Sequence, residues 1–203
     1  MSNLIQQISS MKRLLFLMLS LLALTARAQV SPDSIEFNEK GEFSIVVPTI
    51  ADARQTFLYS KAFFVARNQT HKTKIVTSDS VSYKLQVSGT IAGDNLTVSM
   101  PSGKIQYRNT VENFLLSITA KDQRFRVKIE SPTYDFDQYD QYGLTKISHE
   151  TARAFTFHIG FAEEMGGQVG ITKTVNKNRA VRYAELINEM LEYIKTQIED
   201  DDF

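Results

Sequence analysis

Four segments in the middle of the chain alternate apolar and polar residues with a period of two, and this pattern constrains the fold more than any other feature. Their apolar members are Tyr83, Leu85 and Val87; Leu96, Val98 and Met100; Phe114, Leu116 and Ile118; and Phe125, Val127 and Ile129. Successive strand residues point to opposite faces, so each segment has one apolar and one polar face. Such strands form antiparallel sheets that are covered on one face only.

Two amphipathic helices are predicted to cover the apolar face. The first is expected over Ile50–Arg67, after a strand at 42–47 and a capping-box-like start at Thr49. The second is expected over Val181–Ile198, with one apolar stripe made of Ala184, Ile187, Met190, Leu191, Ile194 and Ile198. The predicted fold class is therefore α+β, an antiparallel sheet with two helices on one face. One domain is expected over residues 42–200, preceded by a polar leader at 29–41.

The segment 152–162 fits two kinds of secondary structure. Phe155, Phe157, Ile159 and Phe161 alternate with polar or small residues, which favours a strand. A helix that begins at Ser148 would instead place Ala152, Phe155 and Ile159 on one face. The strand is the preferred prediction, and the helix is the alternative.

Several local motifs resemble domain-of-unknown-function family 4468. They are Glu42-Phe-Ser-Ile-Val-Val-Pro48, Phe63-Phe64, Asp79 ahead of Lys84-Leu85 and Gly89, and Lys121-Asp-Gln-Arg-Phe-Arg-Val-Lys-Ile-Glu130. The resemblance covers residues 42–130 and implies a fold like that of the TATA-binding protein (TBP-like). It also implies an exported protein of Bacteroidota-type bacteria. The family has no established activity, so the resemblance implies no catalytic residue.

The N-terminal region predicts export. Met11-Lys12-Arg13 precedes the apolar run Leu14–Leu24, and Ala26-Arg27-Ala28 fits the small-x-small rule for signal-peptide cleavage. As a helix the run spans only about 16 Å, well short of the hydrocarbon core of about 30 Å. We expect a signal peptide over residues 1–28, with translation starting at Met11 and cleavage between Ala28 and Gln29. The mature protein is expected to be soluble, without a transmembrane segment, in the periplasm or secreted.

The residue types restrict the chemistry that the chain can perform. The sequence has no cysteine, which excludes disulfides, a thiol nucleophile, Cys-zinc sites and a lipoprotein anchor. His149-Glu150 begins like a zinc-protease motif, but Arg153 stands where the second histidine is required. Gly166–Thr174 lacks the glycine that precedes lysine in a phosphate loop. No catalytic residue, metal site or cofactor is therefore predicted.

Two groups of residues are candidate contact sites. The polar face of the predicted sheet provides a partner surface, with an ordinary solvated face as the alternative; its residues are Lys84, Leu115, Thr119, Arg124, Arg126 and Lys128. A loop after the last predicted strand combines aromatic and acidic side chains and suits a sugar or peptide. Its residues are Tyr134, Asp135, Asp137, Tyr139, Asp140 and Tyr142.

These observations favour a non-enzymatic exported module that binds an envelope protein or a small ligand. One alternative is a carrier that holds an apolar ligand between sheet and helices. Another is a hydrolase that uses Asp135, Asp137 or His158. Nucleic acid is not an expected partner, because the mature chain has more acidic than basic residues and its open face has no aromatic wedge. Asp33-Ser34-Ile35 and Asp79-Ser80-Val81 also resemble bacterial O-glycosylation acceptors.

Overall fold

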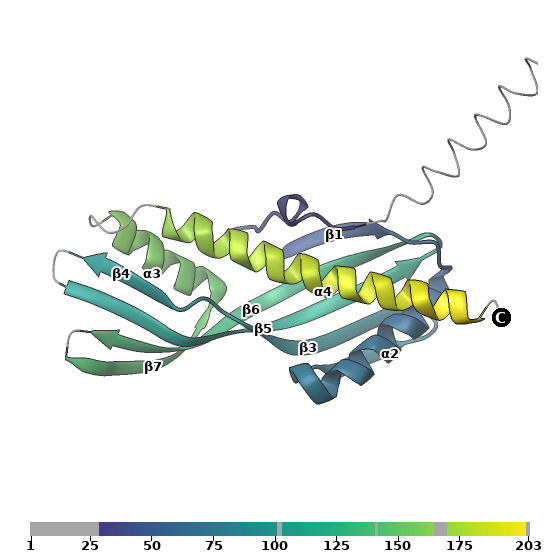
Figure 1. Cartoon of the computed structure of the whole chain (residues 1–203), viewed down its shortest axis with the longest axis horizontal. Coiled ribbons are helices and arrows are strands. Elements are labelled where there is room, and N and C mark those ends of the chain that lie inside the picture. The colour runs from purple at the N-terminus through teal and green to yellow at the C-terminus, as the bar shows by residue number, and fades with distance from the viewer. Residues whose placement is uncertain (1–28, 101–102, 141, 165–169, 202–203) are drawn as a thin grey trace, which may run out of the picture.

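The computed structural model describes residues 29–100, 103–140, 142–164 and 170–201, so the predicted signal peptide lies outside the described residues. Seven strands form one antiparallel sheet in the order β1-β6-β5-β3-β2, with β4 paired to β5 and β7 paired to β6 (Figure 1). The strands are β1 (Phe43–Pro48), β2 (Lys74–Asp79), β3 (Lys84–Ala92), β4 (Leu96–Met100), β5 (Gly103–Lys121), β6 (Arg124–Asp140) and β7 (Gly143–Thr151). The helices are α2 (Ala53–His71), α3 (Ala152–Glu164) and α4 (Ile171–Asp201), after a 3-10 turn η1 (Pro32–Ser34).

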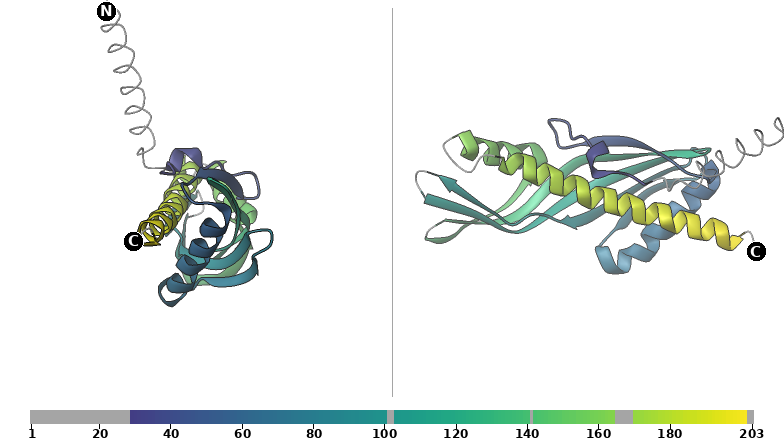
Figure 2. Two further views of the ribbon diagram at one scale, coloured as in Figure 1. Left: turned by 90° about the vertical axis from the view of Figure 1, so that its right-hand side faces the viewer. Right: turned by 45° about the horizontal axis from the view of Figure 1, so that its top comes forward.

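The three α-helices lie on one side of the sheet, which confirms the predicted α+β class. The long strands β5 and β6 run the length of the molecule, and α4 lies along them (Figure 1). The end-on view in Figure 2 shows the strands curving partly around α2 and α4. Helix α2 packs against β3 and β5, whereas α3 packs against β4, β6 and β7. The opposite face of the sheet is left open, as the polar face of the predicted strands requires.

Irregularities in β5 and β6 change which residues face the helices. In β6, Phe125, Val127 and Ile129 are buried, but further along Tyr134 and Phe136 are the buried residues. The register shifts between Asn113 and Leu115 of β5, opposite a left-handed residue at Ser131 (φ 46°). A bulge adds one residue to one strand and so reverses its alternation. Without that change, the second half of β6 would turn its apolar side to solvent.

The predicted aromatic and acidic loop at 134–142 is therefore wrong. Residues 134–140 are the second half of β6, and β7 pairs with them from Thr133↔Thr151 to Asp140↔Gly143. The regular alternation that marks the first half of β6 stops at Ile129, and the bulge hides its continuation from a search for period two.

Two apolar clusters fill the space between sheet and helices. The larger lies under α2 and α4 and includes Phe57, Leu116 and Ile187. The smaller lies under α3 and includes Tyr134 and Phe155. Stacked and edge-to-face ring pairs join several members of the smaller cluster, which are Tyr107, Tyr134, Phe136 and Phe155.

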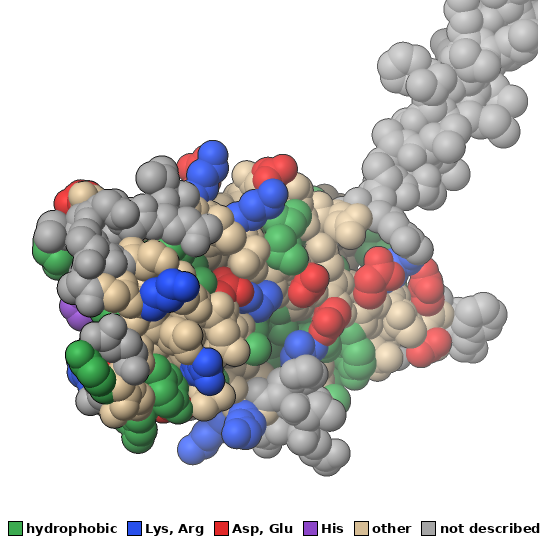
Figure 3. Space-filling model, turned by 60° about the vertical axis from the view of Figure 1, so that its left-hand side comes forward, with side chains coloured by type: hydrophobic (Ala, Val, Ile, Leu, Met, Phe, Trp, Pro, Cys, Tyr) green, Lys and Arg blue, Asp and Glu red, His purple; other side chains and the backbone are tan. Residues whose placement is uncertain are grey.

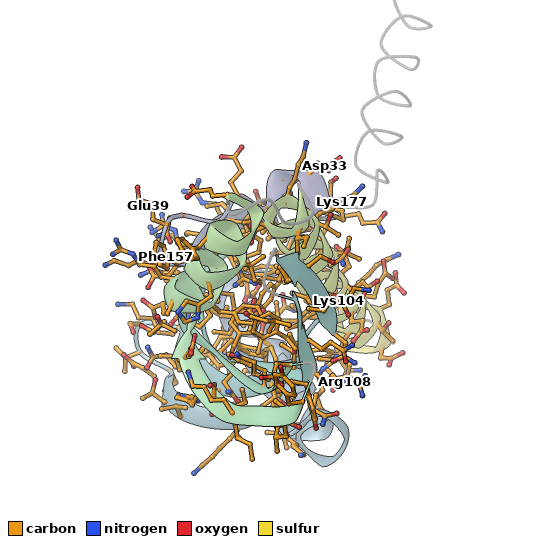
Figure 4. The ribbon with its side chains drawn as sticks, turned by 90° about the vertical axis from the view of Figure 1, so that its left-hand side faces the viewer. Asp33, Glu39, Lys104, Arg108, Phe157 and Lys177 are labelled. Carbon is orange, nitrogen blue, oxygen red and sulfur yellow. The ribbon has the colours of Figure 1, made fainter. Side chains whose placement is uncertain are left out.

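Segment 152–164 is a helix, so the preferred prediction of a strand is wrong, as is the helix start at Ser148. Ala152, Phe155 and Ile159 are buried at helical spacing, while Phe157 is 68% exposed. Figure 4 shows Phe157 on the outer side of α3. Apolar residues at every second position also contain the i, i+4 pair that a helix uses, so local sequence could not separate the two. Packing in the smaller cluster favours the helix over the strand, because only a helix covers β4, β6 and β7 together.

The predicted ends of the other helices also need correction. Helix α2 begins after Asp52, whose Oδ1 accepts a hydrogen bond from Gln55 N at 2.7 Å in a true capping box. Ile50, Leu58 and Val65, which are apolar residues within the predicted range, are 64%, 45% and 57% exposed. Helix α4 begins at Ile171, before the predicted start at Val181. It has the predicted stripe, with only Ile198 partly rather than fully buried.

The leader segment packs against α4. Val30 and Ile35 are buried, and the backbone of Val30 exchanges two hydrogen bonds with the Asn188 amide, at 2.7 and 3.0 Å. The leader is therefore attached to the folded core, and the domain boundary at residue 42 stays a prediction. Among the described residues, no helix combines the length and the apolar character needed to cross a membrane.

Candidate anion-binding surface

Cross-strand pairing arranges the open face of the sheet into rows. One row consists of Asp79, Lys84, Thr119, Arg126 and Val46, which pair in that order across β2, β3, β5, β6 and β1. Hydrogen bonds from Ser82, helped by the Lys84 charge, lower the pKa of Asp79. The next row toward the β5–β6 turn consists of Lys121 and Arg124. Residues in a row lie about 5 Å apart and the rows about 7 Å apart, as sheet geometry dictates. Four basic side chains thus project from neighbouring positions on the same face.

These side chains surround a shallow hollow with a volume of about 440 Å³. Its lining consists of Val46, Lys84, Thr119, Lys121, Arg124, Phe125 and Arg126, and we call it the basic hollow. Within the described part of the chain, none of its four basic side chains forms a salt bridge. The nearby Asp122 in the β5–β6 turn instead accepts a hydrogen bond from Ala53 N at 3.0 Å. The hollow therefore has a local excess of positive charge.

Four of the six residues predicted for the partner surface come together here: Lys84, Thr119, Arg124 and Arg126. Lys128 is one row away, and its ammonium contacts the Glu130 carboxylate at 2.6 Å. This contact raises the pKa of Lys128 and, together with a hydrogen bond from Ser117, lowers the pKa of Glu130. Leu115 lies outside the lining of the hollow.

Sequence reasoning missed Lys121 and Val46. Both could have been found from the pattern, because Lys121 continues the polar face of β5 by two residues beyond Thr119. Lys121 also faces Arg124 across a two-residue turn. Val46 is 52% exposed and belongs to the polar face of β1.

The predicted aromatic and acidic group is divided between the two faces of β6. Tyr134 is buried in the smaller cluster, whereas Asp135 and Asp137 point to the open face. Asp135 accepts a hydrogen bond from Asn113 at 2.7 Å and contacts His149, and these two bonds lower the pKa of Asp135. Asn109 donates to Asp137 at 2.7 Å. These carboxylates already have protein partners.

The remaining members of the group are also separated. The Tyr139 ring lies 5.4 Å from the Arg108 guanidinium, and Tyr142 is 88% exposed. Asp140 accepts a hydrogen bond from Tyr142 N at 2.7 Å, which closes the β6–β7 turn. No single contact loop is formed.

The two described histidines contact different carboxylates. His149 contacts Asp135 on the open face, whereas His158 lies 3.0 Å from Glu150 on the helix side of β7. The side chain of His158 is 47% exposed. The two contacts thus belong to opposite faces of the sheet, and they assemble no shared acid–base pair. In the described ranges, no three His, Asp or Glu side chains lie together as a metal site would need.

A buried ionic network joins the two apolar clusters. Arg179 donates one hydrogen bond to each Glu112 oxygen, at 2.6 and 2.9 Å. Tyr134 donates to one of these oxygens at 2.9 Å, and Tyr183 donates to the other at 2.8 Å. Arg179 also donates to the Gly41 carbonyl at 3.0 Å and lies over the Phe37 ring. Glu112, Arg179 and Tyr183 are at most 1% exposed, so this network is structural and offers no access to a ligand. Sequence reasoning missed it, because nothing local links residues 112 and 179.

Burial acts on the ionisation of this network. It raises the pKa of both Tyr134 and Tyr183, and the neighbouring Glu112 charge raises it further. Burial lowers the pKa of Arg179, but the charge and hydrogen bonds of Glu112 outweigh it and hold Arg179 protonated. The network therefore favours a charged Arg179 beside neutral tyrosines.

A second hollow lies at the boundary between sheet and helices. It has a volume of about 90 Å³ and is lined by Arg67, Thr73, Thr90, Ile91, Ala92, Phe114 and Leu186. Small-molecule sites usually measure about 300–1,000 Å³. This hollow is too small for the apolar ligand of the carrier alternative.

No family model and no curated protein matches the chain. The structure is similar to that of a TBP-like protein from Parabacteroides distasonis, with 14% identity and a TM-score of 0.49, over 79% of this chain and 96% of that one. It is also similar to a DUF4468 family protein from Bacteroides ovatus, with 17% identity and a TM-score of 0.38, over 74% of this chain and 93% of that one. At these scores no residue role passes from one protein to another, and the fold rests on the strands and helices described above.

Proposed function

We propose that this protein is a non-catalytic binding module of the cell envelope that holds an anionic partner in the basic hollow. The observation that carries the proposal is the set of four basic side chains on neighbouring strand positions, none of which forms a salt bridge within the described part of the chain. Arg124 and Arg126 suit carboxylate or phosphate groups, because a guanidinium donates two parallel hydrogen bonds to either one.

The position of the hollow supports binding rather than simple solvation. Its side chains project from β3, β5 and β6, which are the inner strands of the sheet. A rigid backbone reduces the entropy that a partner must remove on binding. Exposed Val46 and the Thr119 hydroxyl add an apolar contact and a hydrogen-bonding group between the charges.

Retention on immobilised heparin tests this function. The mature chain has an excess of acidic residues, so binding to a polyanion would report a local basic site rather than net charge. The double variant Arg124→Glu, Arg126→Glu should elute at much lower salt than the native protein. The matched control is Lys61→Glu, Lys177→Glu, which makes the same charge change on exposed helix positions. Equal losses in both variants would refute a specific basic site.

The proposed location rests on the N-terminal sequence. Protein recovered from the envelope of its host should begin at Gln29, as N-terminal sequencing would show. A chain that keeps residues 14–24 would contradict export through a cleaved signal.

A further inference from the structure

The C-terminal half of α4 has a charge opposite to that of the basic hollow. From residue 185 to 201 it contains six acidic residues and one basic residue, Lys195. Its last turn contains no basic residue. Glu192, Glu199 and Asp200 are exposed, and Lys195 lies 3.7 Å from Glu199. Figure 3 shows acidic side chains gathered toward this end of the molecule.

The acidic helix end is compensated only in part among the described residues: Arg67 pairs with Glu189 and Lys195 lies near Glu199, whereas Glu192 and Asp200 form no salt bridge. The C-terminus of a helix carries a partial negative charge, so Glu199 and Asp200 lie where acidic residues are unfavourable. One lysine cannot balance both the carboxylates and the helix dipole. A cationic partner would remove this repulsion.

The acidic end and the basic hollow belong to opposite sides of the sheet. Helix α4 covers one face of the sheet, and the hollow opens on the other. The last turns of α4 also extend past the ends of the strands, where a neighbouring molecule can reach them (Figure 1). Charge complementarity and geometry thus favour contact between two copies.

We infer that the basic hollow of one copy binds the acidic end of α4, around Glu199 and Asp200, from a second copy. This inference rests on the proposed function, since it names the anionic partner of the same hollow. The contact joins two different surfaces, so it builds either a closed ring or a growing chain of copies. Because it is mainly electrostatic and exposed, salt should weaken it.

Sedimentation velocity on two charge-reversed variants tests the inference. The hollow variant is Arg124→Glu, Arg126→Glu, and the helix variant is Glu199→Lys, Asp200→Lys. The native protein should self-associate in about 50 mM NaCl and dissociate in about 500 mM NaCl, where screening is strong. Each variant alone should lose this association. An equimolar mixture should regain it, because each variant supplies the surface that the other has reversed.

Control variants separate this inference from the proposed function. Glu36→Lys, Glu39→Lys changes two exposed acids of the leader by the same charge and should leave association intact. Circular dichroism would establish that all variants fold. A native protein that stays monomeric at low salt, or a mixture that does not reassociate, would overturn the self-association. If heparin retention still depended on Arg124 and Arg126 in that case, the proposed function would stand without it.

Discussion

Removing one partner of the buried Glu112–Arg179 pair should destabilise the protein far more than removing both. The two side chains are 0% and 1% exposed and share two hydrogen bonds. Glu112→Gln keeps the shape but leaves the Arg179 charge without its counterion inside the protein. Breaking a buried pair in this way costs about 3–5 kcal/mol. That is a large share of a typical folding stability of about 5–15 kcal/mol.

The size of the loss follows from the contacts of Glu112. Its carboxylate accepts hydrogen bonds from Tyr134 and Tyr183 as well as from Arg179, so the substitution disturbs all of them. A glutamine amide places an NH2 group, which only donates, where one of the two accepting oxygens stood. The Gly41 carbonyl and the Phe37 ring cannot replace the lost negative charge, since neither is ionised.

Urea denaturation of five proteins would measure this coupling: native, Glu112→Gln, Glu112→Leu, Arg179→Met, and the double variant Glu112→Leu, Arg179→Met. We expect each of the three single variants to lose about 3–5 kcal/mol, and the double variant to lose clearly less than either of its two parent single variants. A slope m that stays constant would show that the unfolded states are comparable. Additive losses, or a loss below about 1 kcal/mol for Glu112→Gln, would refute the reading of this pair as a coupled structural unit.

Three further predictions concern ionisation, packing and capping. Tyr134 and Tyr183 have raised pKa values in the folded state, so the folded protein holds protons that the unfolded chain releases above about pH 10. Their contribution to stability is therefore complete below that pH and should fall as pH rises, by up to about 1.4 kcal/mol per tyrosine and pH unit. Urea denaturation between about pH 8 and about pH 11 would measure this loss. Tyr134→Phe should reduce this alkaline slope, and an unchanged slope would count against it. Phe155→Ala should cost about 3–5 kcal/mol and Phe157→Ala less than about 1 kcal/mol, because only Phe155 is buried; equal losses would contradict the helix. Asp52→Ala should lower stability by about 1 kcal/mol through loss of the α2 cap, whereas Asp52→Asn should cost much less, and thermal melts would compare the two.

The sequence by itself determined the type of fold and much of the candidate surface. Regular alternation in Tyr83–Val87, Phe114–Ile118 and Phe125–Ile129 was sufficient to predict an antiparallel sheet with one open face, because strand geometry assigns each residue to a face. The same parity placed Lys84 and Arg126 together on that face. Continuing the pattern by one residue pair would have added Lys121.

Only the tertiary structure decided where local alternation is interrupted or fits two structures. The bulge near Ser131 joins residues 134–140 to β6, and long-range pairing with β7 stabilises that half of the strand. Segment 152–164 becomes a helix because β4, β6 and β7 leave an apolar surface that a helix covers. The Glu112–Arg179 pair joins residues far apart in the sequence, and its energy arises from burial that no local pattern records. Local geometry therefore assigned the faces of the sheet, whereas packing between distant segments decided what covers them.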